Sequence, residues 1–130
     1  DDGIGSLRFA IAQCSNPEDY IYIAEFIDSI FLVSDTIILD KNLSIFHSGN
    51  EKVVIQTTSS SPVFKTNPGV LITLNNIEIH SGGVASSKAL LNNGNTILWN
   101  VDIINSIPGE IPVMNTGILE ISETVQIKNQ

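Results

Sequence analysis

Apolar and polar residues alternate in short runs along the chain, and one such run recurs at a fixed interval. Ile77-Glu78-Ile79, Val101-Asp102-Ile103 and Val125-Gln126-Ile127 each read apolar, polar, apolar, and each begins 24 residues after the last. Leu43-Ser44-Ile45 has the same pattern one longer interval upstream. A repeat of this size built on short strands is typical of a solenoid, in which each unit buries its apolar side on its neighbours.

This repetition predicts which side chains stack in the interior. Alternation along a strand turns every second side chain inward, so two interior columns are expected. They would consist of Leu43, Ile77, Val101 and Val125, and of Ile45, Ile79, Ile103 and Ile127. Asn42, Asn76 and Asn100 directly precede three of the runs. Asn tolerates unusual backbone at a corner, and stacked Asn side chains can form a hydrogen-bonded ladder there.

The fold class that follows is all-β, with three short strands per turn and successive turns about 4.8 Å apart in a parallel β-helix. Gly69, Gly94 and Gly117 each follow a further short apolar segment and fit turns between the units. An antiparallel sandwich also has short strands and regular turns. Repetition in one register favours the β-helix.

Residues 6–14 form the one convincing helix. Ser6 is a suitable N-cap, and Leu7, Ala10, Ile11 and Cys14 share one apolar face. A solenoid leaves apolar surface and strand edges open at its ends, so this helix is expected to cap one of them. Residues 1–19 would be the cap and 20–130 the coils of a single domain. No cap follows the last coil, so the chain is interpreted as the N-terminal part of a longer solenoid, continued by more chain or by a partner.

Composition excludes several classes of function. The 130 residues carry a net charge of -8, and the six basic residues are scattered. Nucleic-acid binding is therefore not expected. No apolar run is long enough to span a bilayer. Cys14 is the only cysteine, which excludes an internal disulfide, and no neighbouring base marks it as a nucleophile.

Several segments resemble motifs of secreted and cell-surface bacterial right-handed parallel β-helix proteins of the pectate lyase-like superfamily. Residues 5–11 (GSLRFAI) are similar to the opening GSLREAI of that family, although Phe9 replaces its acidic residue. Residues 16–23 look like a degenerate form of the PGDTIxF strand without its Gly. Residues 41–45 (KNLSI) resemble KNLTI, and residues 70–82 resemble VTLSGLTITNG. The resemblance implies a right-handed β-helix with a helical cap, found in adhesin-like and polymorphic outer-membrane proteins and in polysaccharide-active enzymes.

One predicted outward column contains acids. It consists of Ser44, Glu78, Asp102 and Gln126, with only Lys128 as a basic neighbour. Glu78 and Asp102 would lie one strand spacing apart, where two carboxylates could hold calcium or serve as a glycosidase pair. Solvated acids on an acidic surface are the other interpretation, and the one we expect. No catalytic residue and no cofactor is assigned.

The adjacent outward column would contain Phe46, His80, Ile104 and Lys128. Phe46, His80 and Ile104 are candidates for an interaction surface, unless a loop covers them. His47 and His80 lack the spacing of zinc ligands.

The function expected from these features is that of a non-catalytic structural or adhesive module of a secreted or surface bacterial protein. Its partner would be a surface glycan or a protein. Two alternatives remain open at this stage. The first is a carbohydrate-active enzyme of the lyase or glycosidase kind. The second is an assembly component that docks through its uncapped end.

Overall fold

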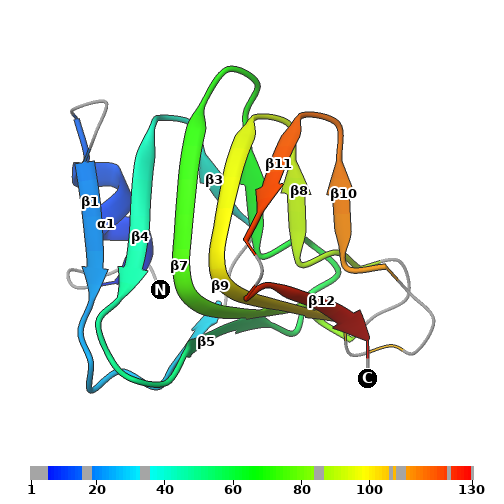
Figure 1. Cartoon of the computed structure of the whole chain (residues 1–130), viewed down its shortest axis with the longest axis horizontal. Coiled ribbons are helices and arrows are strands. Elements are labelled where there is room, and N and C mark those ends of the chain that lie inside the picture. Colours follow the sequence, from blue (N-terminus) through cyan, green and yellow to red (C-terminus); the bar gives the residue numbers. More distant parts are fainter. Residues whose placement is uncertain are drawn as a thin grey trace.

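The chain forms a parallel β-solenoid of about four turns with one short N-terminal helix (Figure 1). The computed structural model describes residues 6–15, 19–32, 36–83, 87–105, 107, 111–122 and 124–129. All strand pairs among them are parallel, which confirms the β-helix class and excludes the antiparallel sandwich. Residue 5 of the first motif and residues 16–18 of the second lie outside the described residues.

Each turn of the solenoid contributes a strand to each of three walls. Wall 1 contains β1 (Asp19–Ile23), β4 (Leu43–His47), the first half of β7 (Leu71–His80), the first half of β9 (Asn95–Asn105) and β11 (Ile118–Ile121). Wall 2 contains β2 (Ser29–Leu32), β5 (Val53–Thr57), the second halves of β7 and β9, and β12 (Gln126–Asn129). Wall 3 contains β3 (Ile37–Leu39), β6 (Phe64–Thr66), β8 (Leu90–Asn92) and β10 (Val113–Asn115). Because β7 and β9 bend through the corner between walls 1 and 2, those walls form one eight-stranded sheet (Figure 1).

The N-terminal helix α1 (Leu7–Gln13) docks against the first coil, as predicted. The Ser6 hydroxyl accepts a hydrogen bond from the Phe9 N–H at 3.1 Å and caps the helix. Leu7 and Ile11 are buried in the core. No helix among the described residues is long and apolar enough to cross a membrane.

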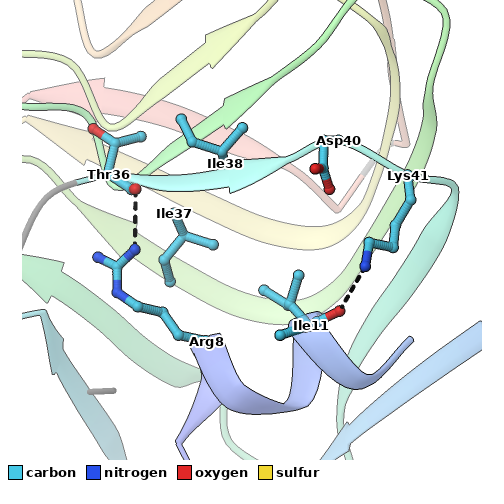
Figure 2. Close-up of a pocket in the computed structure, with 8 residues that line it drawn as sticks. Arg8, Ile11, Thr36, Ile37, Ile38, Asp40 and Lys41 are labelled. Carbon is cyan, nitrogen blue, oxygen red and sulfur yellow. Dashed lines mark hydrogen bonds between the residues drawn. The ribbon is translucent and has the colours of Figure 1, made fainter. Parts of the chain in front are cut away.

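Two cations fasten this helix to the coil at its two ends (Figure 2). Arg8 Nη1 donates to the Thr36 carbonyl at 3.1 Å. Lys41 Nζ donates to the carbonyls of Ile11 at 3.2 Å and of Cys14 at 2.9 Å, at the C-terminal end of the helix. The helix is therefore held by hydrogen bonds as well as by apolar packing.

The interior consists of stacked aliphatic columns. On wall 2, Ile55, Ile79 and Ile103 are Cα partners in successive coils, and all three are completely buried. Ile127 continues their column in the last coil, where it is more exposed. Burial of each such side chain contributes about 1.5–3 kcal/mol. The expected columns are confirmed for Ile77 and Val101, and for Ile79, Ile103 and Ile127. Val125, the expected last member of the first column, is partly buried and packs against the core.

The first member of each expected column is wrong. Leu43 pairs with Ile72, and Ile45 with Leu74, so both belong to wall 1. The true wall 2 neighbours of Ile77 and Ile79 are Val53 and Ile55, each 24 residues upstream. Every wall uses the same apolar, polar, apolar alternation, so the pattern identifies inward positions without identifying the wall. The 24-residue interval therefore continues upstream to Val53 and Ile55, one coil further than expected.

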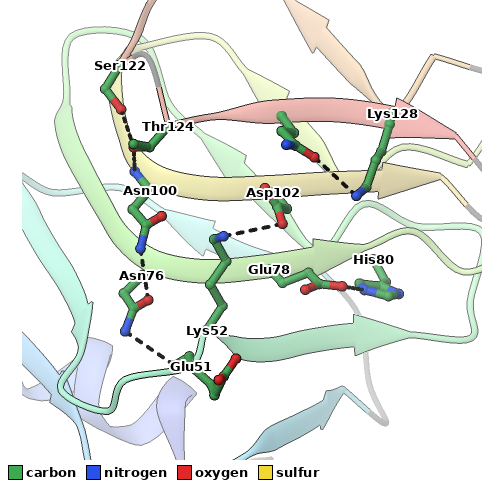
Figure 3. Close-up of polar contacts among 11 residues, drawn as sticks. Glu51, Lys52, Asn76, Glu78, His80, Asn100, Asp102, Ser122, Thr124 and Lys128 are labelled. Carbon is green, nitrogen blue, oxygen red and sulfur yellow. Dashed lines mark hydrogen bonds and ion pairs between the residues drawn. The ribbon is translucent and has the colours of Figure 1, made fainter.

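Asn76 and Asn100 form the corner between walls 1 and 2 (Figure 3). Both have left-handed backbone, with φ of 61° and 53°. Asn100 Nδ2 donates to Asn76 Oδ1 at 3.1 Å, and Thr124 Oγ1 accepts from the Asn100 N–H at 3.1 Å. The predicted ladder is confirmed for these two Asn residues. Asn42 is not part of it, because its Oδ1 instead accepts from the Leu71 N–H.

Asn76 also closes a wider corner in the preceding coil. There, β4 and β5 are joined by residues 48–52 instead of by one corner residue. Asn76 Nδ2 donates into this turn, at 2.8 Å from the Gly49 carbonyl and 3.1 Å from the His47 carbonyl. One side chain thus satisfies carbonyls of one coil and supports the corner of the next.

A second ladder, inside the solenoid, was not predicted. Thr66 Oγ1 and Thr96 Oγ1 both donate to Asn92 Oδ1, at 2.6 and 2.7 Å. Asn92 Nδ2 donates to Asn115 Oδ1 at 2.8 Å and to the Ile118 carbonyl at 2.9 Å. Asn92, Thr66 and Thr96 are completely buried, so these bonds offset the cost of burying their polar groups.

Gly69, Gly94 and Gly117 lie beside this ladder, at the turns from wall 3 to wall 1. Gly69 has φ of +83°, which an L side chain rarely adopts. A Cβ on Gly117 would lie 2.0 Å from the Gly94 carbonyl oxygen of the coil before it. The turns predicted from these glycines are confirmed, and close stacking of the coils explains the residue type.

Two adjacent isoleucines on β3 allow a matched test of the inward assignment. Ile37 is 2% exposed and Ile38 is 44% exposed. We expect Ile37→Asp to place an unpaired charge in the core, at a cost of several kcal/mol, and to prevent folding. Ile38→Asp should fold, with nearly unchanged stability. Circular dichroism and thermal unfolding of both variants measure this, and equal behaviour of the pair would refute the assignment.

The corner can be tested at Asn76. Asn76→Ala removes the hydrogen bonds into the wide turn and places alanine at positive φ, so we expect a loss of about 2–4 kcal/mol in the free energy of unfolding. Asn76→Gly should lose about 1 kcal/mol less, because glycine accepts the backbone conformation. Asn42→Ala, away from the corner, is the control, with an expected loss below about 1 kcal/mol. Urea denaturation gives the three values; equal losses would contradict the corner role.

Candidate functional site

Two outward surfaces of the solenoid carry side chains suited to binding or chemistry. The acidic row lies on wall 2 and consists of Glu78, Asp102 and their partners. The aromatic surface lies on wall 1 and consists of Tyr20, Tyr22, Phe46 and Trp99.

Glu78 and Asp102 are direct neighbours across β7 and β9, as the repeat predicted. Each carboxylate has its own partner (Figure 3). Glu78 Oε1 lies 2.5 Å from Nε2 of His80, and Asp102 Oδ2 lies 3.4 Å from Nζ of Lys52. Both acids are therefore already engaged by neighbouring side chains.

Lys52 is the residue that sequence reasoning missed in this row. It lies in the wide turn just before β5, whose strand pairs with the second half of β7. The expected column placed Ser44 beside Glu78, and this was wrong, because Ser44 pairs with Thr73 on wall 1. Val54 occupies the place beside Glu78. Correct assignment of the turn before Val53 would have revealed a basic residue next to the acids.

The acidic row is incomplete as a metal site. Calcium takes six to eight oxygen ligands, and here the two carboxylates are shared with an ammonium group and an imidazole. The described part of the chain contains no group of three or more His, Cys, Asp or Glu side chains that could hold a metal ion. The geometry supports surface acids paired with a neighbouring lysine and a neighbouring histidine.

Phe46, His80 and Ile104 do not form one surface, which corrects the expected column. Phe46 lies on wall 1 between Tyr22 and Asn75. Gln56 takes the expected place of Phe46 beside His80 on wall 2. Ile104 does pair with His80 but is only 3% exposed, so it is covered and offers no contact surface.

The aromatic surface begins on the first coil, where Tyr20 and Tyr22 alternate with the inward Ile21 and Ile23. The Phe46 ring lies 5.7 Å from each of the two Tyr rings, centroid to centroid, and the Tyr rings are 6.2 Å apart. Tyr22 is 71% exposed and Tyr20 58%. The alternation of Tyr and Ile over residues 20–23 was a usable signal for this outward pair.

Trp99 extends this surface along the axis of the solenoid. Phe46 pairs with Asn75, and Asn75 pairs with Trp99, so Tyr22, Phe46 and Trp99 lie in one outward column. Trp99 is 57% exposed. Two strand spacings, or about 10 Å, separate it from Phe46.

Among the described residues, the outward side of wall 1 carries no basic side chain and one acid, Glu120 on β11. The outward residues of β1, β4 and the first halves of β7 and β9 are Tyr20, Tyr22, Ser44, Phe46, Leu71, Thr73, Asn75, Asn95, Ile97 and Trp99. Wall 1 and wall 2 thus differ sharply in chemistry, although they belong to one sheet.

Shallow hollows adjoin both ends of wall 1. One, of about 410 Å³, lies between α1 and β1 and is lined by Gln13, Cys14, Tyr20 and Tyr22, among others. Another, of about 340 Å³, follows the glycine turns and is lined by Leu71, Asn95 and Ile118, among others. These hollows add concave surface beside the exposed rings.

A third hollow, of about 420 Å³, lies between α1 and β3 (Figure 2). Arg8 and Lys41 line it, and their hydrogen bonds to backbone carbonyls hold the helix against the coil. It is therefore interpreted as the docking seam of the cap.

Cys14 lies at the C-terminal end of the cap helix and is partly buried. Its thiol donates to the Ala10 carbonyl at 3.4 Å. Burial raises the pKa of the thiol, and Asp19 raises it further, while Lys41 acts in the opposite direction. A thiol with a raised pKa is a poor nucleophile, which agrees with the expectation of an unreactive Cys14.

No protein-family profile, curated protein or solved structure matches the chain. The family that the N-terminal motifs resemble is thus not identified by these comparisons. The structure establishes a parallel β-solenoid of about four turns with an N-terminal helix.

Calcium offers a direct test of the acidic row. Because Lys52 and His80 already engage the two carboxylates, we expect millimolar calcium to change the melting temperature by about 1 °C or less. Thermal unfolding with calcium and with EDTA measures this, and Asp102→Asn is the control. A rise of several degrees that Asp102→Asn abolishes would establish a cation site instead.

Proposed function

We propose that this chain is a non-catalytic structural and adhesive module of a secreted or cell-surface bacterial protein, and that it binds its target through the outward side of wall 1. The observation that carries the proposal is the exposed aromatic surface. Tyr20, Tyr22 and Trp99 are each more than half exposed to water. Exposed rings add little to the stability of a sheet, and their grouping on one wall is typical of an interaction site.

The structural part of the proposal rests on the regular stack. Each coil contacts the next through parallel strands in all three walls, and the Asn76 and Asn92 ladders add hydrogen bonds between coils. Such nearest-neighbour stacking gives a stiff rod. A stiff rod suits a spacer that presents one of its sides to a partner.

The location of the protein is part of the proposal. It is supported by the resemblance of residues 5–11 and 41–45 to secreted and surface β-helix proteins of the pectate lyase-like superfamily. The cap helix that this resemblance implies is present.

A carbohydrate-active enzyme is the second candidate, and one observation favours it. Glu78 and Asp102 lie side by side with a lysine and a histidine within reach, and lyases and glycosidases use such groups. Against it, the basic groups are paired with the acids, so neither acid is poised towards a substrate. None of the three hollows described above is lined by either acid.

The two candidates differ in whether product forms. The chain is incubated with polygalacturonate and calcium, and separately with xylan and cellulose. Absorbance of unsaturated product and release of reducing ends are then followed. We expect no product above that of a Glu78→Gln, Asp102→Asn double variant. Product formed by the wild type and lost in the double variant would replace the adhesive proposal with an enzymatic one.

A further inference from the structure

We infer that the target of wall 1 is an extended, neutral polysaccharide that lies along the solenoid axis across Tyr22, Phe46 and Trp99. This inference rests on the proposed function and names the chemistry of its partner. Three properties of wall 1 carry it: the arrangement of the rings, the polar side chains between them, and the absence of basic side chains among its described residues.

The rings form a preorganised platform. Tyr20, Tyr22 and Phe46 are stacked with interplanar angles of 23–29°, and their backbones are fixed by the pairing of β1 with β4. Pyranose rings present apolar C–H faces that pack on aromatic rings, and a fixed platform loses little entropy on binding. Trp99 adds a further ring in the same column, so a chain that lies along the axis meets rings at intervals.

Polar side chains lie between the rings. Ser44, Thr73 and Asn75 are outward and partly exposed, and the structure ties none of their side-chain hydroxyl and amide groups to another described residue. In the glycine-turn hollow, Asn95 Oδ1 is buried without a hydrogen-bond partner among the described residues. Sugar hydroxyls are both donors and acceptors, so they can satisfy all of these groups.

Charge selects a neutral ligand. Among the described residues, no basic side chain points outward from wall 1, and its one outward acid is Glu120 on β11. An acidic glycan would find no cation on this wall, and the chain as a whole repels it with a net charge of -8. A protein interface would also use exposed aromatic residues, but the interleaved hydroxyl and amide groups favour a polyhydroxylated ligand.

Trp99 allows the site itself to be observed, because it is the only tryptophan of the chain. The full chain is titrated with hexasaccharides from cellulose, chitin and mannan, and retention on the insoluble polymers is measured in parallel. We expect retention on at least one polymer, with a shift of tryptophan fluorescence towards the blue as its oligosaccharide covers the ring. No retention and no shift with any of the three would overturn the inference.

Variants locate the binding. Tyr22→Ala and Trp99→Ala should each weaken retention at least tenfold, or about 1.4 kcal/mol, without changing the melting temperature, because both rings are exposed. Met114→Ala is the matched control, since Met114 is an exposed apolar residue on wall 3 and should bind as the wild type does. Equal retention by all variants would overturn the assignment to wall 1.

Two further outcomes separate this inference from the proposed function. Retention on polygalacturonate that weakens with salt would overturn the choice of a neutral ligand. Binding to protein-coated beads alone, lost in Trp99→Ala, would overturn the glycan assignment and leave an adhesive module. Release of sugar products by the chain would overturn the proposed function itself.

Discussion

The in-register pairing of β7 with β9 is the constraint on which the rest of the molecule depends. These strands pair in parallel on both sides of their corner, with the same offset of 24 residues before and after it. A side chain in one coil must therefore fit directly against the equivalent side chain of the next. This requirement explains why Ile79 lies between Ile55 and Ile103. A shift by one residue would turn every interior aliphatic group towards water.

Register survives the corner only because the chain turns within one residue. Left-handed backbone at Asn76 and Asn100 makes that turn without adding length, and their amides bond from coil to coil. In the preceding coil the same corner is formed by residues 48–52. The Asn76 amide donates hydrogen bonds to the His47 and Gly49 carbonyls at this longer turn. Inside the solenoid, Asn92 provides the same kind of bond between coils at a fully buried position. Stacking of aliphatic side chains determines how the coils pack, and the amide ladders add hydrogen bonds that keep neighbouring coils in register.

Features governed by local rules could be predicted from the sequence. The helix cap at Ser6 depends on one hydroxyl and a nearby N–H, and the inward positions depend on simple alternation. Assignment to a wall could not be predicted, because Leu43-Ser44-Ile45 has the same alternation as Val53-Val54-Ile55 opposite Ile77. That error hid Lys52, whose place beside Asp102 depends on the path of the wide turn. Burial of Ile104 depends on cover from elsewhere in the chain, which alternation does not encode.

Outward side chains do not have to pack against the equivalent side chains of the next coil in the interior. Walls 1 and 2 of the same sheet therefore carry different kinds of outward residues. On wall 2, Asp102 pairs with the Lys52 ammonium group and Glu78 with the His80 imidazole, so both carboxylates are engaged within the molecule. On wall 1, Tyr22 and Trp99 have apolar surface that no interior packing uses. Strand propensity favours aromatic residues on a sheet, yet Thr or Val would serve equally without exposing so large a ring. The same pairing that stacks the core also aligns these rings along the axis. A ligand with its own linear repeat is the partner that such a surface can match over several coils.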